Sequence, residues 1–353
     1  MKRRIVFIVL LLLLAFVARQ QSTPGVELAQ DLYLHPSGNV INLVIPINKK
    51  ADLFKGKVDN KFLMNRIYEV FQDSFDFVFF IYDDYRKPDS LYYGKCFPVQ
   101  NTAQGIGKKI FDQSQEFGSF SKLKGIIHLT RNTAIREGPI LHELMHIWGN
   151  DIMKTDIAGH WGYTGVGGQL GGFQRLVHLR DNYYKGFVEG HTGFSLESNW
   201  GNTTPYSPLE LYLMGLLPPE DVPPIKIAIN PEGDPSHNGL FTAEGIDTIC
   251  IEDIIRENGE RQPDFLSSQE SFRGLVVLVS DAPVSEFLFD KVSDDAKQFS
   301  LQGPPRRNWR EWPNWWGKEN FYSATQGLAC LELGFLEEVL RSNDPEESIS
   351  MRN

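Results

Sequence analysis

Two histidines one helical turn apart, with a glutamate between them, are the residues of this chain best suited to chemistry. His142, Glu143 and His146 lie in the segment GPILHELMHIWGN and follow the pattern H-E-x-x-H. Positions i and i+4 share one face of a helix, so both imidazoles can reach one metal ion while the carboxyl group handles a water molecule. The pattern therefore predicts Zn²⁺ as the cofactor, the two histidines as ligands, and Glu143 as the general base of a hydrolytic reaction.

The residues around this motif predict the elements that position it. The run KGIIHLT at residues 124–130 is short, apolar and β-branched, which favours a strand. Pro139 suits the first position of a helix, and Gly149 suits its end, because glycine tolerates the left-handed conformation. The helix between them carries apolar residues all round and is expected to be buried.

Catalytic zinc takes three protein ligands and leaves one position open, so a third ligand is required. His160 is favoured, because it follows the motif in a glycine-rich loop, residues 159–172, that allows the backbone to fold back beneath the metal. Glu210 is the alternative third ligand, although a helix-capping sequence already explains a glutamate there. Asp156 and His191 are further candidates.

The same residues carry a family resemblance. A strand, a turn and a buried helix with H-E-x-x-H resemble the zincin metallopeptidases, and HELMHIWG resembles the metzincin pattern H-E-x-x-H-x-x-G. The pair His160-Trp161 is similar to the late ligand of the leishmanolysin-like metzincins, where an insertion precedes the third histidine. Over residues 138–217 this resemblance implies a zincin-like domain, His160 as a ligand and hydrolysis of peptide bonds. Leu170 occupies the position nearest to the methionine turn of that family.

A second resemblance extends over most of the chain. The segments HWG, LGG, YSPLELYLMGLLPPE, IEDIIRENG and FYSATQG are similar to those of an uncharacterised group of exported bacterial proteins. This resemblance implies a shared architecture and brings no established activity.

The order of expected elements predicts an α+β fold. Strands are expected at 40–47 and 75–82 and a helix at 59–73, ahead of the motif helix. A helix at 206–217 follows, and a further helix and strand are expected at 251–258 and 275–280. We therefore predict a zincin-like catalytic domain, a mixed sheet plus the active-site helix, over residues 26–222, and a C-terminal α/β extension over residues 223–353.

The N-terminus predicts export. Three basic residues precede an apolar run at residues 5–18, which is shorter than the roughly 20 residues of a membrane span. Residues 1–22 are therefore expected to be a signal peptide, or an uncleaved anchor that tethers the protein to a membrane. The protein is then secreted, periplasmic or membrane-anchored.

Composition narrows the partners. The net charge of −10 provides no basic surface for nucleic acid. Cys96, Cys250 and Cys330 are too widely spaced for a cysteine metal site. The sequence is compatible with a disulfide between two of them and with three buried thiols. The cluster between Trp309 and Trp316 suits either a binding surface or a packed core. Composition leaves the oligomeric state open.

Three functions are compatible with the sequence. The first is an exported zinc endopeptidase acting on a peptide or protein, with Tyr163, Tyr206 or Tyr212 as a candidate oxyanion donor. The second is a zinc hydrolase of another cell-envelope amide or ester. The third is a catalytically silent zincin-fold binding protein, which the presence of Glu143 disfavours, because a scaffold does not need a base.

Overall fold

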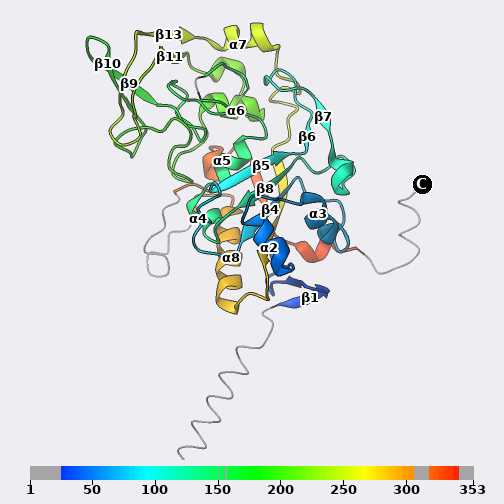
Figure 1. The fold of residues 1–353 in the computed structure, drawn as a ribbon. Helices are drawn as coiled ribbons and strands as arrows, with labels where there is room; N and C mark the ends of the chain where they lie inside the picture. The colour runs from blue at the N-terminus through cyan, green and yellow to red at the C-terminus, as the bar shows by residue number, and fades with distance from the viewer. Residues whose placement is uncertain (1–24, 150, 156, 306–317, 342–353) are drawn as a thin grey trace, which may run out of the picture.

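One mixed sheet organises the fold, which is α+β as predicted (Figure 1). The computed structural model describes residues 25–149, 151–155, 157–305 and 318–341. The strand order is β1-β2-β3-β14-β4-β8-β5, with β15 paired to the start of β14. The strands are β1 (Val26–Ala29), β2 (Leu32–Leu34), β3 (Val40–Val44), β4 (Phe77–Tyr82), β5 (Gly94–Pro98), β8 (Gly125–Leu129), β14 (Ser271–Ser280) and β15 (Cys330–Glu332).

The centre of this sheet is parallel and buried on both faces. β3, β14, β4 and β8 run parallel to one another, whereas β5 lies antiparallel to β8 at the edge. All six residues of β4, FVFFIY, are buried. A continuous apolar run is what a parallel strand covered on two sides requires.

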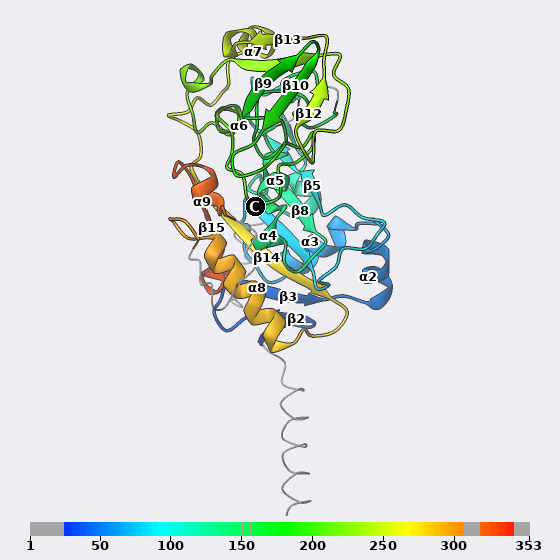
Figure 2. The ribbon, with the colours of Figure 1, turned by 90° about the vertical axis from the view of Figure 1, so that its left-hand side faces the viewer.

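Successive residues of the sheet pack into two different cores. Val78, Phe80 and Tyr82 join one core with α2 (Ile47–Leu53) and α3 (Asn60–Tyr68). Phe77, Phe79 and Ile81 join the other, together with the helices α5 (Ile140–Met145), α6 (Pro208–Met214) and α8 (Glu286–Phe299). Figure 2 shows α8 and the pair α2 and α3 on opposite sides of the sheet. The motif helix α5 is thus fixed to one face of the sheet.

A region rich in loops lies beyond α5 at the end of the molecule opposite β1 (Figures 1 and 2). It has a small core of its own around Tyr163, Phe173, Phe194 and Phe241. Its elements are β9 (Arg175–Arg180), β10 (Tyr183–Phe187), β11 (Ile225–Ile229), β12 (Leu240–Thr242), β13 (Gly245–Ile249) and α7 (Ile251–Asn258). The remaining short elements include β6 (Gln100–Asn101), β7 (Phe111–Asp112), α4 (Ala134–Glu137) and α9 (Phe321–Ala324).

Most predicted elements are present; several are shorter than expected, α7 has the predicted bounds, and β14 begins four residues earlier than predicted. The prediction that Gly149 ends the motif helix is wrong. The helix α5 ends at Met145, and its C-cap residue His146 has right-handed backbone angles. Gly149 is needed for packing instead, because a Cβ there would lie 2.8 Å from Cε of Met145 and 2.9 Å from Cδ1 of Leu170.

The predicted boundary near residue 222 does not separate two sheets. β14 comes from the predicted C-terminal extension, yet it lies between β3 and β4 in the sheet formed by the N-terminal half. The sequence alone did not reveal this, because parallel pairing joins strands far apart in the chain.

Several predictions fall on residues outside the described ranges. These are the signal peptide or anchor at residues 1–22, with its tether at 5–18, the cluster from Trp309 to Trp316, and Asp156. Within the described ranges, no helix has both the length and the apolar character needed to cross a membrane. Cys96, Cys250 and Cys330 are free thiols.

Candidate metal centre

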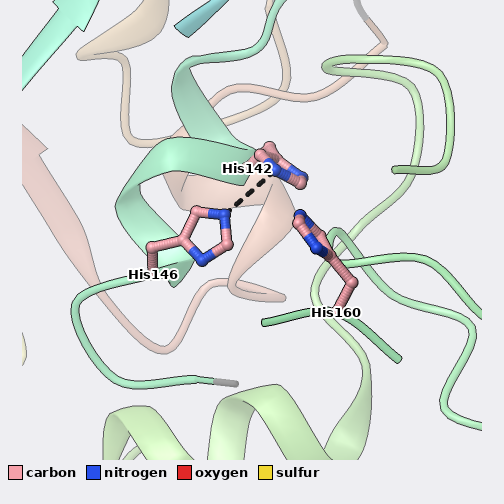
Figure 3. A group of neighbouring side chains, drawn as sticks. All are labelled: His142, His146 and His160. Carbon is pink, nitrogen blue, oxygen red and sulfur yellow. Dashed lines mark hydrogen bonds between the residues drawn. The ribbon is translucent and has the colours of Figure 1, made fainter. Parts of the chain in front are cut away.

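Three histidines converge next to α5 (Figure 3). His142 and His146 extend from the helix and its cap, and His160 comes from the loop that follows. One nitrogen from each ring lies within 4.8 Å of the others, and the ring centroids are 4.8 to 5.3 Å apart. The structure therefore brings together the three histidines that the sequence predicts as ligands.

Hydrogen bonds leave the Nε2 atoms of two rings directed at the cluster. Nδ1 of His142 lies 2.9 Å from the carbonyl oxygen of Gln169, and Nδ1 of His160 lies 3.0 Å from that of Ala158. A carbonyl only accepts, so each Nδ1 carries the proton and each Nε2 presents a lone pair. Nε2 of His142 and Nε2 of His146 are 3.2 Å apart. Such a carbonyl contact is typical of metal-binding histidines, because it fixes the tautomer.

Burial keeps the helical histidines neutral. It lowers the pKa of His142 to about 4, with a smaller contribution from His160. Burial, and then the neighbouring His142 and His160, lower the pKa of His146 to about 2. Neutral imidazole is the form that binds a metal ion, so both rings are ready to act as ligands near neutral pH.

Glu143 lies against the edge strand β5. Its side chain is buried, and the backbone N–H of Cys96 on β5 donates to its carboxyl group. Burial raises the pKa of Glu143 to about 8. A Cβ on Gly94 would lie 2.5 Å from Oε1 of Glu143, so the glycine permits the close approach of β5. A carboxyl group with a pKa near neutrality is well suited to accept and return a proton.

A cleft of about 1320 Å³ opens beside this group. His142, Glu143, His146 and His160 all line it. Further lining residues come from the segment 92–98, which includes the edge strand β5, and from the segments 107–111 and 197–201. The histidine cluster is thus accessible to a ligand of peptide size.

Glu210, the alternative third ligand, lies outside the histidine cluster. Its side chain is fully buried, and its carboxyl oxygens accept hydrogen bonds from backbone and side-chain N–H groups. Burial raises its pKa, and these N–H groups oppose that increase. The predicted capping box with Ser207 is present. The carboxylate is occupied within the protein and does not line the cleft.

The other candidates are also placed elsewhere. The ring of His191 stacks on Trp200, with centroids 4.1 Å apart, and its Nε2 lies 3.2 Å from Oγ1 of Thr203. The hydroxyl of Tyr206 donates to the carbonyl of Leu141. The residues that line the cleft do not include Tyr206, Tyr163 or Tyr212. None of the predicted oxyanion donors is therefore placed to act.

Two contributors to the site were not predicted. Gln169 acts through its backbone carbonyl, which no residue type encodes. Lys108 is partly buried, and its Nζ donates to the carbonyl oxygens of His146 and Ile147 at the end of α5, 2.5 and 3.2 Å away. A cation at a helix C-terminus is favourable because it meets the unpaired carbonyl groups. The lysine is 38 residues from His146, so only the tertiary fold reveals its role.

Comparison with protein-family models, with curated proteins and with solved structures finds no match to this chain. What the fold and the site define is an α+β protein whose three-histidine cluster could hold a metal ion. The functional argument accordingly depends on the chemistry of the cluster and of the cleft.

Proposed function

We propose that the protein is a zinc-dependent metalloendopeptidase with a zincin-like domain. His142, His146 and His160 hold the zinc ion, and Glu143 is the general base. The observation that carries this proposal is the meeting of three imidazoles with a buried carboxyl group in one cleft.

The donor set fits Zn²⁺. Imidazole nitrogen is a common zinc ligand, and three histidines match the three protein ligands of catalytic sites. The two hydrogen bonds to backbone carbonyls fix the ring orientation that such ligands need. The cleft supplies the open side on which water and substrate enter.

In this reaction Glu143 moves the protons. Zinc, when bound, supplies a Lewis acid that polarises the scissile carbonyl and lowers the pKa of the attacking water, to about 7 in favourable cases. Glu143 accepts the proton of that water and delivers it to the leaving amine. The N–H of Cys96 holds the carboxyl group in place between these two transfers.

The edge strand supports a peptide as the substrate. Among the described residues, β5 pairs only with β8, and it lines the cleft next to Glu143. An extended peptide can add to such an edge through main-chain hydrogen bonds. This favours an endopeptidase over a hydrolase of a small ester or amide.

The decisive experiment compares wild type with Glu143→Ala and His160→Ala. Zinc content is measured by elemental analysis, and cleavage of casein is measured with and without a chelator. We expect one zinc ion and chelator-sensitive cleavage in wild type, and zinc without cleavage in Glu143→Ala. Zinc-loaded wild type that cleaves no polypeptide would direct the search to cell-envelope amides or esters, and wild type without zinc would refute the proposal.

We also propose export through residues 1–22, on the sequence pattern alone. N-terminal sequencing of the protein recovered from cells distinguishes a cleaved signal peptide from a retained anchor.

A further inference from the structure

The carboxylate of Glu210 joins two segments of the glycine-rich loop to α6. Oε1 accepts from Nε1 of Trp161 at 2.8 Å and from the backbone N–H of Leu170 at 2.9 Å. Oε2 accepts from the backbone N–H of Gln169 at 3.0 Å and of Ser207 at 2.9 Å. Four N–H donors therefore surround one carboxylate.

Each loop segment held by Glu210 leads directly to a proposed zinc ligand. Trp161 follows His160 in the chain, and its backbone N–H also donates to the carbonyl of Leu170. The N–H of Gln169 binds Glu210, while the carbonyl of the same residue binds Nδ1 of His142. Glu210 thus binds the side chain of the residue that follows His160, and it binds the backbone of the residue whose carbonyl orients His142.

The packing around the carboxylate allows little adjustment. Glu210 has no solvent exposure, and Trp161 is equally buried. A Cβ on Gly168 would lie 1.9 Å from Oε2 of Glu210, so the loop backbone sits directly against the carboxylate. Only a glycine allows this approach, and a shift of the carboxylate would move the loop with it.

Helix capping explains only part of this arrangement. The capping box of α6 needs the Ser207 side chain and the bond from Ser207 N–H to Glu210. The three bonds from Trp161, Gln169 and Leu170 add nothing to the helix end. They connect α6 to the metal-binding loop.

We propose that Glu210 is a positioning residue that sets the zinc affinity of the site through the Trp161 and Gln169 segments. This inference rests on the proposed zinc site and adds a function for a buried residue outside the cleft. Loss of a group that orients metal ligands typically weakens metal binding about 10- to 100-fold.

The first test uses Glu210→Gln. Glutamine keeps the volume but replaces one acceptor oxygen by an NH₂ group, which faces two N–H donors and cannot accept from them. Zinc affinity is measured by competition with a chromophoric chelator, alongside the melting temperature. We expect the dissociation constant for zinc to rise about 10- to 100-fold.

Ser207→Ala is the matched control. It removes the hydroxyl that accepts from Glu210 N–H at 3.3 Å and leaves the three loop bonds in place. It should lower the melting temperature while zinc affinity stays within about twofold of wild type. Equal affinity in Glu210→Gln and wild type, or an equal loss in both variants, would overturn the inference.

Trp161→Phe keeps the test decisive if Glu210→Gln does not fold. It removes one donor and retains an aromatic ring, so we expect a smaller loss of zinc affinity. In metal-free protein, the Nδ1 proton of His142 should exchange faster with water in the Glu210 variant, as seen by NMR of labelled histidine. Zinc-loaded wild type without cleavage would refute the peptidase alone, whereas unchanged zinc affinity in both variants would refute the positioning role alone.

Discussion

The backbone carbonyl of Gln169 lies 2.9 Å from Nδ1 of His142, although the two residues are 27 positions apart. This contact ties the motif helix to the glycine-rich loop that also carries His160. The histidine cluster is therefore built from two segments, and changes in the loop should affect the histidines of the helix.

His160→Ala should abolish stoichiometric zinc binding, whereas His191→Ala should not. The ring of His160 lies 5.1 to 5.3 Å from those of the two helical histidines, while His191 stacks on Trp200. Elemental analysis of both purified variants gives the answer. Full zinc content in His160→Ala would remove this residue from the ligand set.

Gly94→Ala should inactivate the protein without emptying the metal site. The new Cβ would lie 2.5 Å from Oε1 of Glu143, so the carboxyl group or β5 must move. A displacement of this size at a reacting group costs on the order of 100-fold in kcat/KM. Gly245→Ala is the control, because its Cβ would meet only Cδ1 of Ile229, at 3.7 Å. Equal rates for the two variants would contradict the role of Glu143.

Metal-free Glu143→Gln should be more stable than metal-free wild type at pH 8. The pKa of Glu143 is raised from 4.5 to about 8 in the folded state, so folded wild type binds this proton more tightly than the unfolded chain does. The resulting stability is present below pH 4.5 and is lost as the pH rises to about 8, at roughly 1.4 kcal/mol per pKa unit. Glutamine does not titrate and escapes this loss.

Urea unfolding at pH 5, 6.5 and 8 on chelator-treated samples measures this difference. His142 and His146 are present in both proteins, so their protonation affects both curves alike. A stability gap that does not widen with pH would show that Glu143 is not titrating in this range.

Asn202 should remain unmodified in a host that glycosylates Asn-x-Thr sequences. The residue has no solvent exposure, and its Nδ2 donates to the carbonyl oxygen of Ile135 at 2.7 Å. Asn202→Ala should lower the free energy of unfolding by about 1–3 kcal/mol, because buried partners lose their hydrogen bonds. Mass spectrometry detects any glycan. An attached glycan in folded protein would contradict the buried position.

The sequence revealed those parts of the site that depend on residue type and local spacing. The helical pair of histidines and the capping box at Ser207 follow from side chains three or four positions apart. The sequence offers Glu210 as the alternative third ligand, because three of its four N–H donors come from residues 161–170 and are not visible in local spacing. Gln169 was missed because it acts through its backbone.

The fold shows the same division between local and distant information. The apolar run of β4 and the helix α3 were predicted within a few residues, because periodicity is local. The position of β14 between β3 and β4 depends on pairing across roughly 200 residues, for which the sequence offers no local signal.

The central place of β14 has a consequence for the newly made chain. A ribosome that has released residues up to 222 has produced every proposed zinc ligand, but not the strand that separates β3 from β4. Until β14 emerges, the facing edges of β3 and β4 are left without their partner, and the support for α5 is incomplete. A nascent chain stalled at that point would be prone to associate with other chains through these open edges, and metal capture should follow completion of translation.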